Sequence, residues 1–198
     1  MVRSNVMKEK VALHLFLFLC WLAPLTGNAY ESDLPLETQS SMPPPNLKAV
    51  SWVLMNPDTG VMIAAKNPDE KMEPASLSKL LTAYIIFREI RRGSLSPEEE
   101  VVISENAWRT GGSRMFIEPG ERISVENLLL GMIVQSGNDA AVALAEHVAG
   151  SEESFSGLLN QVVSELGLRN SHFVNSTGWP HPDHFSSARD ISLITSAI

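Results

Sequence analysis

Cysteine and basic residues are both scarce in this 198-residue sequence. The single cysteine, Cys20, lies in an N-terminal apolar run that we predict is cleaved off, so the mature chain has no disulfide, thiol nucleophile or cysteine–metal site. Lysine and arginine total 15 against 23 acidic residues, which gives a net charge of −8. Nucleic-acid binding requires a clustered basic surface, so this charge argues against a nucleic-acid partner.

No apolar run of clear membrane-spanning length occurs at the N-terminus. Residues 11–25 are apolar apart from His14 and Pro24, follow three basic residues, and are short for a transmembrane helix. Small residues in Gly27-Asn28-Ala29 suit a cleavage site. We therefore predict a secretory signal peptide at residues 1–29; an uncleaved anchor is the alternative.

The remaining chain divides into a linker and one domain. Residues 30–46 are polar and end in three prolines, which predicts a stiff linker. Residues 50–55 and 61–65 read as a hairpin, and both strands are apolar on both faces, which predicts a covered sheet. Shorter extended segments are expected at 101–104 and 115–117. Helices are expected at 76–92, 124–134, 139–148, 153–166 and 189–198.

This order of elements predicts an α/β (α+β) domain over residues 47–198. Two strands form only a marginal sheet, and three or more are needed for independent stability. The last predicted helix reaches the final residue without a stop signal. We therefore expect the chain to be the N-terminal portion of a larger domain.

One charged residue interrupts the apolar helix that begins at residue 76. Lys79 is the only charge between Leu77 and Phe87, and it follows Ser76 by three positions, which places both side chains on one helix face. Burial lowers a lysine pKa, and a neutral amine can act as a general base toward a hydroxyl. The pair predicts a serine nucleophile with a lysine base. Alternatively, Ser76 is a helix N-cap and Lys79 extends to solvent.

A second polar motif, Ser136-Gly137-Asn138, stands where one predicted helix ends and the next begins. A hydroxyl and a carboxamide at such a break can face one cleft. There Ser136 would relay a proton and Asn138 would hydrogen-bond a substrate amide. The alternative is that both residues are helix caps.

The two motifs together resemble a known family. The stretches PASLSKLLT and QSGNDAAVALAEHVAG, with further matches at 106–108, 113–117, 166–173 and 186–190, resemble the low-molecular-mass penicillin-binding proteins. These are the serine-type D-alanyl-D-alanine carboxypeptidases of peptidase family S11. The resemblance implies a DD-peptidase/β-lactamase-like fold, in which helices cover an antiparallel sheet beside an all-helical subdomain.

The resemblance also implies roles for the motif residues. Ser76 would form an acyl-enzyme with the penultimate D-alanine of peptidoglycan stem peptides, and Lys79 would accept its proton. Ser136 would assist proton transfer and Asn138 would hold the peptide. β-Lactam antibiotics would acylate the same serine, and no metal or cofactor is implied. The implied location is the periplasm, with the full-length form peripheral to the inner membrane.

The family's third motif, Lys-Thr-Gly, is missing, and no lysine follows Lys79. In the family that motif lies on a strand lining the cleft, and its lysine anchors the substrate carboxylate. A small β-domain and a C-terminal amphipathic helix follow it. We therefore expect a truncated member that is poorly stable and weakly active or inactive.

Three other functions are open. A class A-like β-lactamase shares the serine–lysine helix, but His172 stands where that reaction needs a glutamate. A D,D-endopeptidase of the same superfamily would cut cross-links instead of releasing terminal D-alanine. A non-catalytic penicillin-binding remnant is the third.

Two histidine patterns are weak leads. The His181-Pro182-Asp183-His184 run is stiffened by its proline and lacks an evident third ligand, so we predict no metal site. His147 lies on an apolar helix, and we predict a packing role for it.

Overall fold

The computed structural model describes residues 43–198. The predicted signal peptide at 1–29 lies outside the described residues, as does the linker up to residue 42. Residues 43–46 are exposed and have no regular secondary structure. Within residues 43–198, no helix combines the length and apolarity needed to cross a bilayer.

The predicted hairpin is confirmed. Strands β1 (Trp52–Met55) and β2 (Met62–Lys66) pair antiparallel, with a bulge after Leu54. The Asn56 side chain shapes the turn, because its Oδ1 accepts the backbone N–H groups of Asp58 and Thr59.

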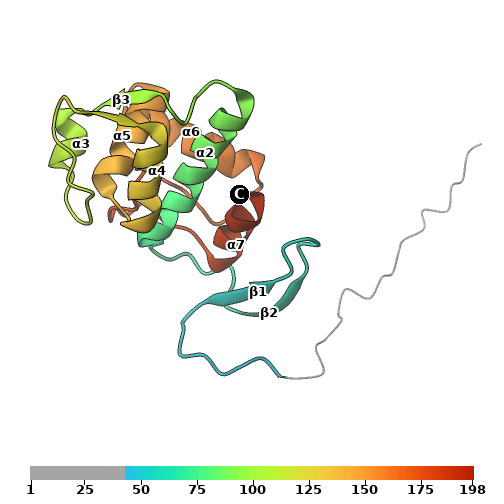
Figure 1. The fold of residues 1–198 in the computed structure, drawn as a ribbon. Helices are drawn as coiled ribbons and strands as arrows, with labels where there is room; N and C mark the ends of the chain where they lie inside the picture. The colour runs from blue at the N-terminus through green and yellow to red at the C-terminus, as the bar shows by residue number, and fades with distance from the viewer. Residues whose placement is uncertain (1–42) are drawn as a thin grey trace, which may run out of the picture. The chain divides into compact units, whose positions relative to one another are not determined.

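Residues 43–198 provide only part of the cover that was expected over this hairpin. Leu54 and Ile63 keep 53% and 46% of their surface exposed, although the apolar residues on both faces of these strands predict burial. Helix α7 (Ala188–Ala197) lies against β1, as Figure 1 shows. The hairpin therefore has apolar surface that the described chain leaves open to solvent.

A second small sheet was not predicted in full. Strands β3 (Glu100–Val102) and β4 (Arg122–Ser124) pair antiparallel, and only β3 overlaps a predicted extended segment. The prediction of an extended strand at 115–117 is wrong: this stretch is irregular, and Phe116 has a positive φ of 63°. Its backbone N–H donates to the buried carboxylate of Asp139 instead of to a strand.

The predicted helices are confirmed, with small shifts at their ends. Short helix α3 was missed because five residues show too little periodicity. The remaining bounds are a 3₁₀ turn η2 (Ala75–Ser78), α2 (Lys79–Arg92), α3 (Glu105–Arg109), α4 (Val125–Val134), α5 (Asn138–Ala149) and α6 (Glu152–Glu165).

Local sequence explains where these helices begin and end. The hydroxyl of Ser124 accepts the N–H of Asn127 and so caps α4 as predicted. Gly93 and Gly150 end α2 and α5 in the left-handed conformation, at φ values of 75° and 82°.

The hydrophobic core lies among the helices. Helix α2 packs against α4, α5, α6 and α7, and Figure 1 shows it running through the middle of the helical group. The largest fully buried side chains are Leu81, Ile85, Ile86, Ile103, Leu128, Met132, Leu144, Phe155, Leu159, Phe173 and Ile194. This core holds the first turn of α2 and the first turn of α5 in fixed positions, which matters because both turns carry predicted site residues.

Candidate active site

Ser76 lies in the 3₁₀ turn that leads into α2, and its side chain is exposed. The N-cap of this turn is Pro74, and no side-chain cap is formed, so the alternative of Ser76 as an N-cap is wrong. The preceding residue, Ala75, has a φ of 47°, which is unusual for a residue with a side chain. The turn thus presents the Ser76 hydroxyl to solvent on a strained but well-supported backbone.

Lys79 is buried, with only 6% of its surface exposed, so the alternative in which it extends to solvent is also wrong. Its Nζ lies 3.4 Å from Ser76 Oγ. It donates hydrogen bonds to Asn138 Oδ1 at 2.7 Å and to the backbone carbonyl of Thr177 at 2.9 Å. Three segments of the chain therefore meet at one amine.

Burial lowers the pKa of Lys79 from 10.5 to about 8. At pH 7 roughly one amine in ten is then neutral, compared with fewer than about one in a thousand for an exposed lysine. A neutral amine has two N–H groups and one lone pair. The two carbonyl acceptors can take the two N–H groups, which directs the lone pair toward the Ser76 hydroxyl.

Asn138 begins α5 and has protein partners on both ends of its carboxamide. Its Oδ1 accepts from Lys79, and its Nδ2 donates to the carbonyl of Gly111 at 2.8 Å. Gly137, not Asn138 or Ser136, is the N-cap of α5, so the alternative of a helix-capping pair is wrong. The structure gives Asn138 a role that the sequence did not suggest, because it orients the lysine amine.

Ser136 lies between α4 and α5 and is partly buried. Its φ of 55° is again unusual for a non-glycine residue, and such strain is often found at functional sites. No hydrogen bond joins its hydroxyl to Ser76 or Lys79 within residues 43–198. Of the four predicted site residues, Lys79 contacts both Ser76 and Asn138, and the role of Ser136 stays a prediction.

Sequence reasoning missed the loop at 174–179. Thr177 supplies only a backbone carbonyl, and no side-chain pattern can reveal such an acceptor. The loop's conformation comes from Asn175, whose Oδ1 accepts the N–H groups of Gly178 and Trp179. His184 was considered only as a metal ligand, yet its Nε2 lies 2.7 Å from Ser78 Oγ.

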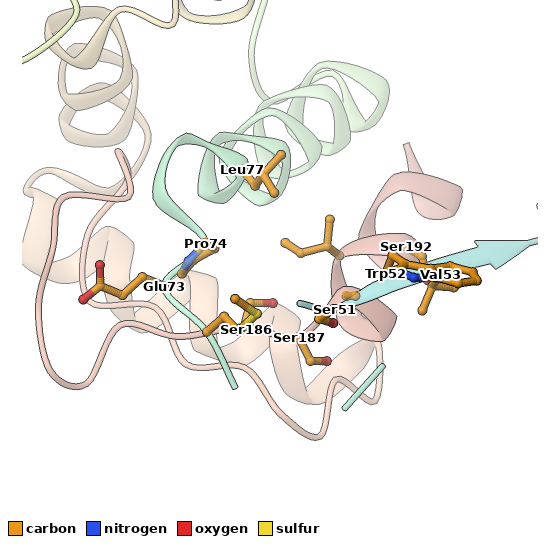
Figure 2. Close-up of a pocket in the computed structure, with 12 residues that line it drawn as sticks. Ser51, Trp52, Val53, Glu73, Pro74, Leu77, Ser186, Ser187 and Ser192 are labelled. Atoms are coloured by element: carbon orange, nitrogen blue, oxygen red, sulfur yellow. The ribbon is translucent and has the colours of Figure 1, made fainter. Parts of the chain in front are cut away.

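A cavity of about 420 Å³ lies beside the 3₁₀ turn, between β1 and the start of α7. Figure 2 shows Trp52 on β1 and Leu77 on the turn among the residues that line it, together with Ser51, Ser186, Ser187 and Ser192. Ser76, Lys79 and Asn138 do not line it. The cluster of Ser76, Lys79 and Asn138 therefore lies next to this cavity and not within it.

His147, the second histidine lead from the sequence, makes a contact with a carboxylate. His147 Nε2 lies 2.8 Å from a carboxylate oxygen of Glu99, which links α5 to the segment before β3. Among residues 43–198 no group of three histidine, aspartate or glutamate side chains is arranged to hold a metal ion.

The helical group, the small antiparallel sheets and the serine–lysine turn together define a class. Solved structures of the same architecture are DD-peptidases and penicillin-binding proteins, so the chain has the DD-peptidase fold. A family model described as D-alanyl-D-alanine carboxypeptidase matches residues 37–198. The chain belongs to this family, peptidase family S11.

Individual relatives agree with this assignment. D-alanyl-D-alanine carboxypeptidase DacC from Escherichia coli K12 is 38% identical over 201 residues, covering 98% of this chain and 48% of the relative. D-alanyl-D-alanine carboxypeptidase DacF from Bacillus subtilis is 42% identical over 147 residues, covering 74% of this chain and 38% of the relative. The crystal structure of D-alanyl-D-alanine carboxypeptidase DacD from Francisella tularensis has 39% identity and a TM-score of 0.76, covering 85% of this chain and 41% of that one. The chain thus spans about half the length, or less, of these three relatives.

Proposed function

We propose that this chain carries the nucleophile and base of a serine D-Ala-D-Ala carboxypeptidase, which removes the terminal D-alanine from peptidoglycan stem peptides. The observation that carries the proposal is the 3.4 Å approach of the buried Lys79 amine to the exposed Ser76 hydroxyl. The names of the relatives support the choice of substrate.

The first step is acylation. Neutral Lys79 Nζ takes the Ser76 hydroxyl proton as Ser76 Oγ attacks the carbonyl carbon of the penultimate D-alanine. The C–N bond then breaks, and the terminal D-alanine leaves as its amine after it gains a proton. The proton from Lys79 is available for this transfer, and we propose that Ser136 relays it.

The second step is hydrolysis of the acyl-enzyme. A water molecule adds to the ester carbonyl, its proton passes to the lysine amine, and Ser76 Oγ leaves as the restored hydroxyl. The Asn138 carboxamide contributes by holding the amine in place in both steps. We propose that it also contacts the peptide through the second N–H of its Nδ2.

The same chemistry predicts reaction with β-lactams. Ser76 Oγ would open the strained lactam ring, and the ring nitrogen would remain attached to the acyl group. Mass spectrometry of the protein after incubation with penicillin tests the proposal directly. We expect one adduct, on the peptide that contains Ser76, and none in Ser76→Ala.

Assays with muropeptides separate the alternative activities. Release of free D-alanine from a pentapeptide supports the carboxypeptidase, whereas cleavage of cross-linked dimers without that release supports a D,D-endopeptidase. A protein that forms the penicillin adduct but releases no product is a binding remnant. Absence of any adduct on Ser76 overturns the proposal.

We further propose that the protein acts in the periplasm. The export pattern at residues 1–29 supports this location, since peptidoglycan lies outside the cytoplasmic membrane. Peripheral association with the inner membrane is proposed for the full-length form alone. Fractionation of cells that express the protein, with immunodetection in each compartment, tests both statements.

A further inference from the structure

Two buried polar side chains next to the site have no part in the proposed reaction. His184 and Ser78 are 2% and 1% exposed, and His184 Nε2 lies 2.7 Å from Ser78 Oγ. Ser78 follows Ser76 by two positions in the 3₁₀ turn. His184 lies more than 100 residues further along the chain, packed edge-on against the ring of Phe173 at 5.3 Å.

The hydrogen bonds around His184 fix the position of its proton. The backbone N–H of Val174 donates to His184 Nδ1 at 3.2 Å, so that nitrogen carries no proton. The proton is therefore on Nε2, which donates to Ser78 Oγ. The Ser78 hydroxyl in turn donates to the carbonyl of Ala75 at 2.8 Å. The result is a chain of hydrogen bonds that all run in one direction and end on the residue before Ser76.

The neutral form of the ring is the one that this arrangement accepts. A second proton on Nδ1 would face the N–H of Val174, which leaves two donors opposed. Burial, with smaller contributions from His172 and His181, lowers the pKa of His184 to about 4. The ring is thus neutral over the whole range in which the Lys79 base works.

The last acceptor in this series of hydrogen bonds is the carbonyl of Ala75, the strained residue of the turn. Its φ is 47°, a conformation that costs energy for a residue with a Cβ and persists only when neighbours hold it. Gly178 holds it from one side: a Cβ on Gly178 would lie only 1.7 Å from the Ala75 carbonyl oxygen. The Ser78 hydroxyl holds the same oxygen through the hydrogen bond.

We propose that His184 and Ser78 are positioning residues for the nucleophile. The neutral His184 ring fixes the Ser78 hydroxyl, which fixes the Ala75 carbonyl and so sets the direction in which Ser76 Oγ points toward Lys79. This inference rests on the proposed acylation of Ser76. It adds two residues to the site that contact neither the substrate nor the reacting atoms.

Acylation kinetics of Ser78→Ala test the proposal. Penicillin acylation is resolved into a non-covalent dissociation constant and a first-order rate of ester formation. Because small misplacements of a reacting group are costly, we expect the rate of ester formation to fall about 10- to 100-fold with the dissociation constant unchanged. The matched control is Ser171→Ala, which removes a partly buried hydroxyl that donates to Asp190 and contacts the Ser186 hydroxyl, with no hydrogen bond to Ser76, Ser78 or Lys79 within residues 43–198. We expect it to lower thermal stability similarly and leave the rate unchanged.

Two substitutions of His184 separate positioning from general packing. The side-chain amide of His184→Gln can still donate to Ser78, whereas His184→Leu cannot. We expect His184→Gln to keep the rate of ester formation within about threefold and His184→Leu to lose as much as Ser78→Ala. Nitrogen-15 NMR of the unsubstituted protein gives a readout independent of activity. We expect one protonated nitrogen, Nε2, at neutral pH.

The outcomes distinguish the positioning role of His184 and Ser78 from the proposed function. If the unsubstituted protein forms the ester and Ser78→Ala forms it equally fast, the positioning role is wrong and the proposed function stands. A charged ring or an Nδ1 proton at neutral pH also overturns the positioning role alone. If the unsubstituted protein forms no ester with penicillin, the proposed function and this inference fail together.

Discussion

At the scale of single residues, Lys79 shows how surroundings change an ordinary side chain into a base. Its burial was predictable, because it is the only charge in an apolar helical run. Its partners were not predictable, since Asn138 and Thr177 lie 59 and 98 positions away in the sequence. With a pKa lowered to about 8 by burial, the amine is partly neutral at pH 7.

Replacing the base provides the first prediction. Lys79→Met removes the proton acceptor but keeps an apolar stem of similar length. We expect the rate of penicillin acylation of Ser76 to fall about 100- to 10,000-fold, the usual contribution of a general base. Gel fluorescence with a labelled penicillin measures it. Lys48→Met, at an exposed position, is the control and should react normally; an equal loss in the control would contradict the prediction.

The pH dependence provides the second prediction. Only neutral Lys79 accepts a proton, so the acylation rate should rise with pH and level off above about 8. In Asn138→Asp a carboxylate replaces the Oδ1 acceptor 2.7 Å from the amine. An opposite charge favours the ammonium form, so the midpoint should move upward by about one pH unit or more. A midpoint that stays near 8 or moves down would show that Lys79 is not the titrating base.

At the scale of elements, the site is formed where a loop presses against a turn. Residues 174–178 contact the 3₁₀ turn η2 and the start of α2 at three points. Gly178 lies against Ala75, the Thr177 carbonyl accepts from Lys79, and the Ser176 carbonyl accepts from Thr82. The close approach at the first point requires glycine, since its φ is 85° and a Cβ would overlap Ala75. This loop therefore determines the geometry of the turn as much as α2 does.

Two glycine substitutions provide the third prediction. Gly178→Ala adds a methyl group where there is no space, and we expect the free energy of unfolding to fall by about 3 kcal/mol or more. Gly150→Ala has nearly the same φ but open space around the added carbon, so it should cost only about 1 kcal/mol. Urea denaturation of both variants measures the difference. Equal losses would mean that conformation alone, and not the contact with Ala75, sets the cost.

Most helices were predictable from sequence because their signals are local. Apolar periodicity gave their extent, Ser124 gave the start of α4, and Gly93 gave the end of α2. The irregular stretch at 115–117 was mispredicted because its apolar residues suggested a strand. Its conformation is set by a distant group, the Asp139 carboxylate, to which the backbone of Met115 and Phe116 donates.

At the scale of the whole molecule, stability should depend on a buried neutral histidine. The folded pKa of His184 is about 4, below its ordinary value of 6.5, so the unfolded chain binds the proton more readily. Its contribution to stability is fully present above pH 6.5 and is lost as the pH falls toward 4.

This linkage provides the fourth prediction. Between pH 6.5 and 4 the unsubstituted protein should lose about 3 kcal/mol more unfolding free energy than His184→Gln, which has no titrating ring. Urea denaturation across this range measures both proteins, and their difference removes the effect of the carboxylates. Parallel curves would show that His184 does not titrate as the structure indicates.

The serine–lysine pair was found from sequence because both residues lie in one turn, where spacing determines contact. The remaining partners come from folding at long range, and a backbone carbonyl such as that of Thr177 leaves no mark in the sequence. The cover expected over the hairpin is likewise incomplete within residues 43–198, which leaves Leu54 and Ile63 exposed. Local patterns therefore located the helices and the serine–lysine pair, but they failed at 115–117 and could not reveal long-range contacts.

Two of the three partners of the Lys79 amine, Asn138 and Thr177, come from distant parts of the chain, and this has a practical consequence. Opening of either the 174–178 loop or the first turn of α5 would admit water to the amine. The pKa of Lys79 would then rise toward the value of an exposed lysine. Ser76 would then lose its reactivity before the helices melt. Covalent capture of Ser76 by a penicillin probe would thus report on the integrity of the tertiary contacts around Lys79, in cells as well as in the test tube.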